Sequence, residues 1–157
     1  MNFVIRDAAM EDFEQVAELE QHLFRYHEGE RPDLFDGEYR YTREEFAKLL
    51  SYPGRIALVA EGEGVLMGLC FGQVEKDSKH PVLRPTVTAE IEDLVVSPAF
   101  RGQGIARALL EKAQTRAAEL GAERIQLGVW YFNENAAHLY RSLGFETAWS
   151  KMEKRLT

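Results

Sequence analysis

The chain has 157 residues, 45% of them hydrophobic and 29% charged, and this composition excludes an intrinsically disordered protein. Its length is that of one domain, residues 1–157, which can bury a core without metals or disulfides. The formal net charge of −7 disfavours a nucleic-acid phosphate backbone as the main partner and suits a cationic substrate better.

The N-terminus and the cysteine content predict a cytoplasmic protein. Residues 1–6 have no basic region followed by an apolar stretch, so we expect no signal peptide. No apolar run approaches the ~20 residues that span a bilayer, so we expect no membrane association. Cys70, the one cysteine, lies in an apolar run without a neighbouring histidine or aspartate, which favours a buried thiol over a nucleophile. A chain with a single cysteine fits a reducing compartment.

The chain begins with signals for a strand and a helix. Residues 3–5 are predicted to form a short strand. A helix follows, because the apolar positions from Phe13 to Phe24 recur at helical spacing. Residues 27–41 break this pattern with glycines, a proline and several acids, and we expect a loop there.

A second helix and a hairpin are predicted next. Thr42 and Glu45 have the spacing of a capping box, so a helix should begin at this point, and a Pro-Gly pair ends it. Residues 56–60 and 65–74 have the apolar character of strands, and the Glu-Gly-Glu-Gly sequence between them predicts a hairpin.

The second half of the chain alternates strands and helices. We expect a strand over residues 88–96, a helix over 105–120 and a strand over 124–130. A short helix over 135–143 follows, and residues 146–156 are predicted as a last strand or pair of strands. This order of elements predicts a mixed α/β fold that is neither doubly wound nor repetitive.

A glycine turn separates the strand over residues 88–96 from the following helix. Gly102 and Gly104 permit close approach of a ligand to the backbone, and the first amides of the helix point unpaired donors outward. A pyrophosphate is the natural occupant of such a site. By itself the turn is weak evidence, because a turn that only starts a helix looks the same. No Gly-Lys-Ser/Thr follows for a P-loop, and the third glycine of a dinucleotide-binding fold is absent.

Taken with its neighbours, the turn resembles the acetyl-CoA motif of the GNAT (Gcn5-related) N-acetyltransferases. Arg101-x-x-Gly104-x-Ala106 is similar to their Arg/Gln-x-x-Gly-x-Gly/Ala. Upstream, the segment Ile91-Glu92-Asp93-Leu94-Val95-Val96-Ser97-Pro98 resembles the fourth strand of the family and its exit. Downstream, the Asn-x-x-Ala-x-x-x-Tyr pattern that ends at Tyr140, followed by Gly144-Phe145, resembles a later helix of the family. The similarity covers roughly residues 88–150.

The resemblance implies the GNAT acyl-CoA N-acyltransferase fold, a central splayed, mostly antiparallel sheet flanked by helices. It also implies transfer of an acetyl group from acetyl-CoA to a primary amine of a small molecule, such as a polyamine, or of a peptide. In this family the pantetheine arm adds to the open edge of the fourth strand like a short strand. For Asn133 the N-cap of a helix is an alternative role that is compatible with cofactor contact. The residues implied to bind the cofactor are Leu94, Val95, Val96, Arg101, Gly102, Gln103, Gly104, Ile105, Ala106, Arg107, Asn133, Asn135, Ala136 and Tyr140.

Two catalytic residues are implied by the same resemblance. Tyr140 aligns with a tyrosine near the thioester sulfur, where it would act as general acid toward the departing thiolate, although its spacing alone predicts a core residue. Glu92 is the first choice for the general base, with Glu90 and Asp93 in reserve. Strand alternation places Glu90, Glu92 and Leu94 on one face and Asp93 on the other. The alternative for Glu92 is a surface or salt-bridged glutamate.

The resemblance is weakest in the region that would bind the acceptor amine. Residues 26–41 interleave aromatic and acidic side chains, which would suit a cationic amine through cation–π contacts and charge pairing. The alternative is a solvated surface loop held down by Leu34 and Phe35. His80 and Arg84, before the strand over residues 88–96, are further candidates to face the acceptor.

Three further expectations concern metals, mechanism and assembly. No metal is predicted, because the histidines show no metal-ligand spacing with carboxylates. A direct ternary complex is favoured over a ping-pong mechanism, because no placed cysteine is available. The competing interpretation is a non-catalytic acyl-CoA-binding sensor. Homodimers are common in the family, and Trp149 on the last predicted strand is a candidate contact. The histidines considered are His22, His27, His80 and His138.

Overall fold

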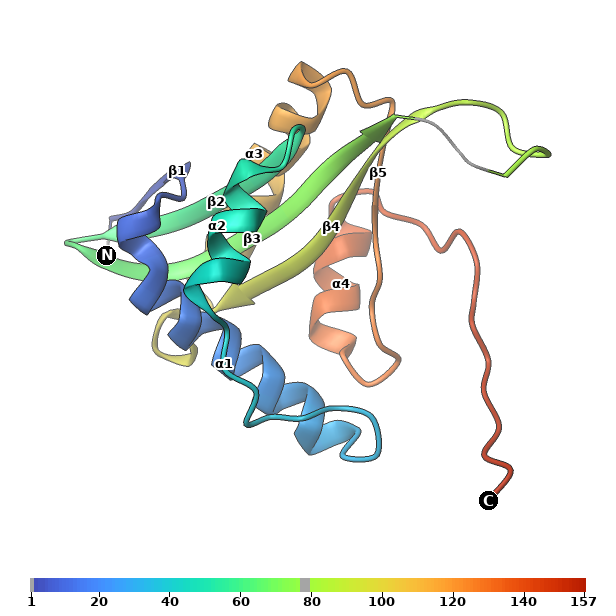
Figure 1. The fold of residues 1–157 in the computed structure, drawn as a ribbon, viewed down its shortest axis with the longest axis horizontal. Helices are drawn as coiled ribbons and strands as arrows, with labels where there is room; N and C mark the ends of the chain where they lie inside the picture. The colour runs from blue at the N-terminus through green and yellow to red at the C-terminus, as the bar shows by residue number, and fades with distance from the viewer. Residues whose placement is uncertain (1, 77–79) are drawn as a thin grey trace.

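The computed structural model describes residues 2–76 and 80–157 and is built around one five-stranded mixed sheet (Figure 1). The strands lie in the order β1-β2-β3-β4-β5. The first four are antiparallel to their neighbours, and β5 alone runs parallel to β4. The predicted mixed α/β fold is therefore confirmed. The strands are β1 (Val4–Asp7), β2 (Arg55–Gly62), β3 (Val65–Lys76), β4 (Val87–Val96) and β5 (Arg124–Leu127).

Helices cover both faces of the sheet. In Figure 1, α1 (Phe13–Glu30) and α2 (Arg43–Ser51) lie on the near face, while α3 (Ile105–Glu119) and α4 (Glu134–Ser142) lie on the far face. Two short 3-10 turns, η1 (Met10–Asp12) and η2 (Pro98–Phe100), precede α1 and the glycine turn. Among the residues that the structure describes, no helix combines the length and apolar character that crossing a bilayer requires.

Each face of the sheet has its own apolar cluster. Under α3, Leu109 and Leu110 pack with Ile56, Met67 and Cys70 from the strands, and none of these side chains is exposed. Burial raises the pKa of the Cys70 thiol to about 12, so the expectation of a buried, unreactive cysteine is confirmed.

The second cluster lies under α1 and α2. Phe46 of α2 is fully buried and stacks on Phe71 of β3, with ring centroids 6.2 Å apart. The predicted capping box sets the start of α2: the Glu45 amide donates to Thr42 Oγ1 at 3.1 Å, and the Thr42 amide donates to Glu45 Oε2 at 2.8 Å. This local signal therefore positions Phe46 over the sheet.

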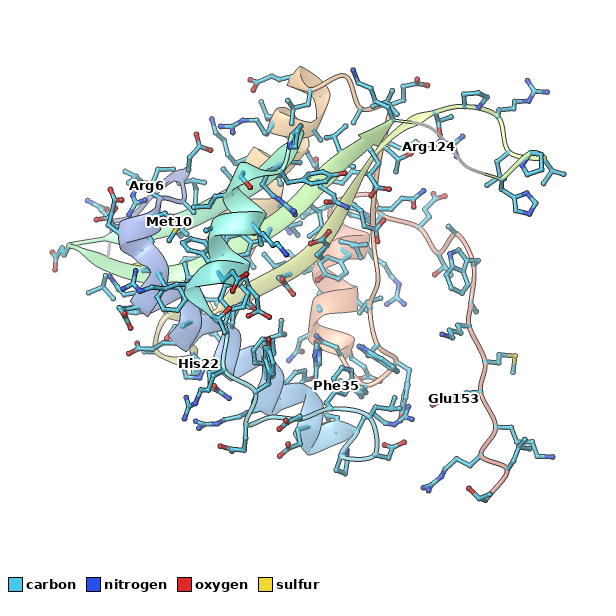
Figure 2. All side chains as sticks on the ribbon, in the orientation of Figure 1. Arg6, Met10, His22, Phe35, Arg124 and Glu153 are labelled. Atoms are coloured by element: carbon cyan, nitrogen blue, oxygen red, sulfur yellow. The ribbon has the colours of Figure 1, made fainter. Side chains whose placement is uncertain are left out.

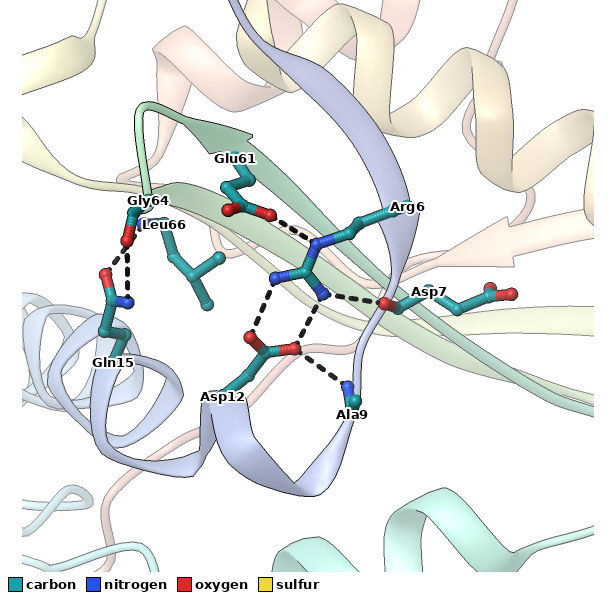
Figure 3. A network of polar contacts seen from close by, with 8 residues as sticks. All are labelled: Arg6, Asp7, Ala9, Asp12, Gln15, Glu61, Gly64 and Leu66. Carbon is teal, nitrogen blue, oxygen red and sulfur yellow. Dashed lines mark hydrogen bonds and ion pairs between the residues drawn. The ribbon is translucent and has the colours of Figure 1, made fainter.

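A polar network fixes the start of α1 against the strands (Figure 3). The guanidinium of Arg6 on β1 donates two hydrogen bonds of 2.8 Å to Asp12 and one of 2.5 Å to Glu61 on β2. Gln15 then bridges to the β2–β3 hairpin, because its Oε1 accepts from the Leu66 amide at 2.8 Å. The network anchors α1 at its N-terminal end, and Arg6 lowers the pKa of Asp12 through the paired hydrogen bonds.

Two predicted boundaries and one predicted strand are wrong. Helix α1 continues to Glu30, past the predicted start of the loop, because Tyr26 and His27 pack against Phe132. Strand β5 ends at Leu127 instead of residue 130, because its ladder with β4 ends where Leu127 lies opposite Ile91. Residues 146–156 form no strand, since no other strand among the described residues lies beside them.

Candidate functional site

The central feature of the site is the point where the ladder between β4 and β5 stops, called the opening below. Their parallel ladder runs from Thr88 opposite Arg124 to Ile91 opposite Leu127 and then stops, while β4 continues to Val96 along β3. Among the described residues, no strand therefore pairs with the last residues of β4 on the β5 side. This is the splay that the family resemblance implies, and it brings Leu94, Val95 and Val96 to its edge.

A β-bulge in β4 changes which side chains face which way. Phe71 pairs with Asp93 and the next residue, Gly72, pairs with Ile91, so Glu92 has no partner on β3. Ile91 packs under α3, yet after the bulge Leu94 packs under α3 as well. A bulge of this kind inserts one extra residue and inverts the alternation beyond it.

The bulge makes the predicted arrangement of the acids wrong. Glu90 precedes the bulge, and its side chain points to the face opposite that of its neighbour Ile91. Glu90 therefore lies on the α1–α2 face and does not share a face with Leu94. Asp93 follows the bulge and lies with Val95 on the α1–α2 face, where Val95 joins the second cluster. Two of the three candidate bases, Glu90 and Asp93, thus come together on one face.

The glycine turn lies where β4 ends. Gly102 and Gly104 have φ angles of 78° and 79°, a left-handed conformation that favours glycine, and Gly104 is the N-cap of α3. The amides of Ile105, Ala106 and Arg107 occupy the first turn of α3, where the helix offers them no acceptor. These amides and the helix dipole form a site suited to an anion.

Two arginines of the turn make contacts within the protein. Arg101 Nε donates to the Val96 carbonyl oxygen at 3.3 Å, which ties the turn to the end of β4. Arg107 donates to Ser142 Oγ at 2.7 Å and so connects α3 to α4. Both side chains belong to exposed residues, so their charges lie at the surface beside the turn; Gln103 is exposed there as well.

Helix α4 supplies the remaining candidate residues. Asn133 Oδ1 accepts a hydrogen bond of 3.2 Å from the Ala136 amide, so its N-cap role is confirmed. Asn135 and Ala136 lie in the first turn of α4. Tyr140 packs against the cluster under α3, on the same face of the sheet as Leu94, and burial raises its pKa to about 12.

The first-choice base, Glu92, lies at the bulge. Its side chain is 39% exposed, and its Oε2 lies 3.4 Å from a guanidinium nitrogen of Arg55 on β2. The salt-bridged glutamate that the sequence left as an alternative therefore matches what the structure shows. The same guanidinium donates to the Gly72 carbonyl oxygen at 3.2 Å, which holds Arg55 at the bulge.

A buried pair of carboxyl groups lies behind Glu92, and sequence reasoning missed one of its members. Glu20 of α1 is 2% exposed, and its carboxyl group is hydrogen-bonded to that of Asp93. Its Oε1 has no hydrogen-bond partner among the described residues. Burial and then the charge of Glu92 raise the pKa of Asp93 to about 6; burial and the charge of Asp93 raise the pKa of Glu20 well above its usual value. The sequence does indicate that Glu20 is buried, because Glu20 falls between Val16 and Leu23 on the apolar face of α1.

The Glu20–Asp93 pair predicts that stability falls as pH rises. The folded protein holds these protons at pH values where the unfolded chain has released them, so their contribution is complete below about pH 4 and declines as pH passes through 6. Glu20→Gln keeps a donor for Asp93 without a titrating proton. Its unfolding free energy relative to wild type should grow by roughly 1–3 kcal/mol between pH 5 and pH 8, as measured by urea denaturation.

Glu18→Gln is the matched control for this prediction, because Glu18 is exposed on the same helix. It should shift stability by the same small amount at both pH values. A difference between Glu20→Gln and wild type that does not change with pH would contradict the shared proton.

The predicted acceptor region contains an aromatic cluster, formed by Tyr26, His27, Phe35, Trp130 and Phe132. The Phe35 ring lies 4.9 Å from His27 and 5.5 Å from Trp130, centroid to centroid. Phe35 therefore holds the loop against α1 as expected, whereas Leu34 is 53% exposed and does not. The cation over this cluster is the protein's own Arg31, 5.7 Å from the Trp130 ring.

Two further expectations concern His80 and Arg84 as acceptor contacts and the presence of a metal site. His80 and Arg84 are exposed in the loop between β3 and β4, at the end of β4 away from the glycine turn. Across residues 2–76 and 80–157, no group of three or more His, Cys, Asp or Glu side chains is placed to hold a metal ion.

Comparison with known proteins establishes the family. The profile of the Acetyltransferase (GNAT) family matches residues 13–145. The chain therefore belongs to the GNAT acetyltransferase family, as its motifs indicate.

Individual relatives agree with this assignment. The uncharacterized N-acetyltransferase YdgE of Bacillus subtilis (strain 168) is 40% identical over 74 residues, which are 47% of this chain and 47% of YdgE. A mutant of the BH1408 protein from Bacillus halodurans has a crystal structure with a TM-score of 0.92 and 28% identity, matched over 98% of this chain and 99% of that one. The aminoglycoside N-acetyltransferase AAC(6')-Iy in complex with CoA has the same fold, with a TM-score of 0.75, 18% identity and coverage of 98% and 99%. The chain matches about half or less of the length of several curated relatives, YdgE included.

Proposed function

We propose that the protein is an acetyl-CoA-dependent N-acetyltransferase that transfers acetyl directly to a primary amine within a ternary complex. The observation that carries this proposal is the opening between β4 and β5 that ends at the glycine turn. A strand edge with unpaired amides and carbonyls suits the two amides of pantetheine, and a helix N-terminus suits the pyrophosphate. Coenzyme A carries both groups in one molecule, and the structural neighbour AAC(6')-Iy is in complex with CoA.

Three segments of the chain bind acetyl-CoA in this proposal. The backbone of Leu94, Val95 and Val96 pairs with the pantetheine amides, and the amides from Gly102 to Arg107 hold the pyrophosphate. Arg101 supplies positive charge beside the turn. Asn133, Asn135 and Ala136 line the opening from the α4 side. The cofactor is a co-substrate, and no metal takes part in the proposed reaction.

The acceptor amine approaches from the opposite face of the sheet. Glu90 and Asp93 lie on the α1–α2 face and Tyr140 lies on the α3–α4 face, with the opening beside β4 between them. A thioester in the opening would meet the amine on one side and Tyr140 on the other. The acidic side chains on the amine side, with Glu92 at the bulge, favour a cationic acceptor such as a polyamine or a peptide amine.

The chemical step forms one C–N bond and breaks one C–S bond. The amine arrives as an ammonium ion and gives one proton to a base, then attacks the thioester carbonyl carbon and releases the second proton as the thiolate leaves. The thiolate of coenzyme A becomes a thiol, so one proton is released overall. An acyl-enzyme step is not part of the proposal, because Cys70 is buried and its pKa of about 12 keeps it protonated.

Tyr140 assists the leaving thiolate in this mechanism. A phenol with a pKa of about 12 is a weaker acid than a thiol with a pKa near 8.5, so complete proton transfer from Tyr140 to sulfur is unfavourable. Tyr140 therefore acts chiefly by donating a hydrogen bond to the sulfur as negative charge develops on it. The proton that the thiol keeps can come from the attacking nitrogen.

Glu92 is the proposed base, with Glu90 and Asp93 as the reserves. Glu92→Gln should lower kcat/KM about 100-fold near neutral pH, because the amide cannot accept the proton that the ammonium ion releases. The ion pair with Arg55 is partly exposed, and its loss should change stability by less than about 1 kcal/mol. Initial rates from pH 5 to pH 9, with thermal unfolding of the same samples, test this prediction.

Glu90→Gln and Asp93→Asn assayed in parallel decide among the three acids. A small loss of kcat/KM in Glu92→Gln together with a loss of about 100-fold in one of the other two variants would transfer the role of base to that residue.

The proposal as a whole is tested by acetyl-CoA calorimetry combined with a thiol-release assay over a panel of primary amines. Cys70 is buried, so a thiol reagent should report coenzyme A with little background from the protein. Binding followed by thiol release with at least one amine is the expected result. Absence of acetyl-CoA binding would refute the proposal. Binding without release across a broad panel would favour the alternative, a non-catalytic acyl-CoA sensor.

A further inference from the structure

One buried carboxyl group takes no part in the proposed reaction. Glu20 is 2% exposed, and Val16 and Leu19 of the same helix are buried with it. Helix α1 carries Glu20 across the near face of the sheet, between the labelled residues Met10 and Phe35 in Figure 2. Burial of a carboxyl group costs free energy, whereas burial of an apolar side chain at the same position would stabilise the fold. The presence of Glu20 therefore points to a role other than packing.

The contact that Glu20 makes is with Asp93 of β4. The two carboxyl groups are hydrogen-bonded, and Glu20 Oε1 has no hydrogen-bond partner within residues 2–76 and 80–157. Two carboxyl groups form a hydrogen bond only when one of them carries a proton, and the more deeply buried group is the one that keeps it. Glu20 is thus the donor in this pair, and the Asp93 carboxylate is the acceptor.

Asp93 is the member of the pair that a ligand can reach. Its side chain is partly exposed, whereas that of Glu20 is buried. Asp93 also directly precedes Leu94, the first of the three residues at the opening beside β4. A ligand at Asp93 would therefore lie on the α1–α2 face, next to the place where the proposed function puts the thioester.

The groups that face the pair favour a cation at Asp93. The charge of Glu92 raises the pKa of Asp93, and the charge of Arg55 lowers it. Arg55 is already paired with Glu92, at 3.4 Å between a guanidinium nitrogen and Oε2. Tyr41 and Cys70 are uncharged near pH 7, because burial first and the acidic pair second raise the pKa of each. The group as a whole is therefore negative and suits a cation from outside the protein.

We propose that Asp93 binds the ammonium group of the acceptor amine and that Glu20 is the positioning residue that orients the Asp93 carboxylate toward it. The site rests on the proposed function, since it would hold the acceptor until Glu92 takes its proton. The proton of Glu20 occupies one lone pair of the Asp93 carboxylate and leaves the others for the N–H groups of the ammonium ion. The pair thus selects a cationic amine over an uncharged molecule of the same shape.

The site makes binding of the amine depend on pH. Burial and the charge of Glu92 raise the pKa of Asp93 to about 6, so Asp93 is a carboxylate at pH 7 and mostly an uncharged acid at pH 5. An alkyl ammonium ion stays charged at both pH values. Its affinity should therefore be highest above pH 6 and fall about tenfold between pH 7 and pH 5.

The first experiment follows the side-chain carboxyl carbon of Asp93 by carbon-13 NMR while 1,4-diaminobutane is added without acetyl-CoA. Asp93→Asn identifies the signal by its loss. We expect a saturable shift with the diamine and none with 1,4-butanediol, the uncharged molecule of the same shape, at constant ionic strength. The dissociation constant at pH 5 should be about tenfold larger than at pH 7. An Asp93 signal that does not respond to the diamine would overturn the proposal.

The second experiment compares two substitutions of Glu20 that differ in hydrogen bonding. Glu20→Gln keeps a donor to Asp93 and should bind the diamine within about threefold of wild type at pH 7. Glu20→Leu suits the apolar surroundings but has no donor, so its dissociation constant should rise about tenfold or more. The titration of Asp93 should also move to higher pH in Glu20→Leu, because the hydrogen bond from Glu20 lowers the pKa of Asp93.

Glu18→Gln is the matched control, because Glu18 is exposed on the same helix and its substitution changes the net charge as Glu20→Gln does. It should bind the diamine as the wild type does. Equal binding by Glu20→Gln and Glu20→Leu would assign Glu20 a packing role and overturn its role as positioning residue.

The outcomes separate the ammonium site from the acetyltransferase activity, because the diamine is titrated without the donor. Thiol release with an amine, but no response of the Asp93 signal, would leave the proposed function standing and overturn the ammonium site. A response of Asp93 without any acetyl-CoA binding would support the ammonium site and refute the proposed function.

Discussion

Gly104→Glu is expected to abolish measurable acetyl-CoA binding, raising the dissociation constant roughly 100-fold or more. Gly104 has a φ of 79°, and a Cβ at its position would meet no atom within 4 Å, so a steric clash is not the cause. The effect has two parts. A left-handed conformation costs a non-glycine residue about 1–2 kcal/mol, which favours a rearranged turn, and the new carboxylate repels the pyrophosphate. Isothermal titration calorimetry with acetyl-CoA measures the result.

Gly121→Glu is the matched control at the other end of α3. Gly121 has a φ of 89° and, like Gly104, open space where a Cβ would lie, so the strain is similar. The added charge is the same but lies at the C-terminal end of the helix, far from the turn. An acid there is also disfavoured by the helix dipole, so Gly121→Glu should be at least as destabilising as Gly104→Glu. If both variants lost cofactor binding equally, the turn would not be the pyrophosphate site.

Local signals predicted the parts of the fold that depend on neighbours in sequence. The capping box of Thr42 and Glu45 requires hydrogen bonds across three residues, and the structure has both of them. The β2–β3 hairpin is similar, since Glu63 and Gly64 have φ angles of 54° and 80°, as a two-residue turn of this kind requires. The glycine turn follows the same rule, because the left-handed angles at Gly102 and Gly104 are properties of those residues.

The side of the sheet on which each candidate base lies could not be predicted in this way, because it depends on a contact between strands. A Cβ at Gly72 would lie 2.4 Å from the backbone oxygen of Glu90, so only glycine permits this approach of β3 to β4 at the bulge. The bulge then turns Asp93 toward Glu20. A glycine inside an otherwise apolar strand is a recognised sign of a bulge, but it does not tell which residue of the facing strand is extra.

Residues 146–156 illustrate a second kind of limit. They predict a strand, and a strand needs a partner that the sequence does not name. The isolated chain leaves this segment unpaired, so the prediction is wrong for the chain alone. The Glu20–Asp93 pair is a similar case within one chain, since burial raises the pKa of both acids and only the fold brings the two side chains together.

Tyr140→Phe is expected to lower kcat roughly 100-fold or more while the dissociation constant of acetyl-CoA changes less than about twofold. Within the described residues the Tyr140 hydroxyl makes no hydrogen bond, and its ring packs against Phe145 with centroids 5.9 Å apart. Phenylalanine keeps this packing, so the melting temperature should stay the same. Only the hydrogen bond to developing charge on sulfur would be lost, an interaction that exists in the transition state and not in the free protein.

Two observations make the Tyr140 prediction specific. Tyr131→Phe is the matched control, because Tyr131 is 76% exposed on the segment that leads into α4. This substitution also removes one tyrosine hydroxyl, and it should leave kcat unchanged. The pKa of about 12 also implies that Tyr140 stays protonated up to about pH 10, so the wild-type rate should show no alkaline limb from this residue below that pH. Equal losses of turnover and cofactor affinity in Tyr140→Phe would instead assign Tyr140 a packing role, and the departing thiolate would then need a different donor.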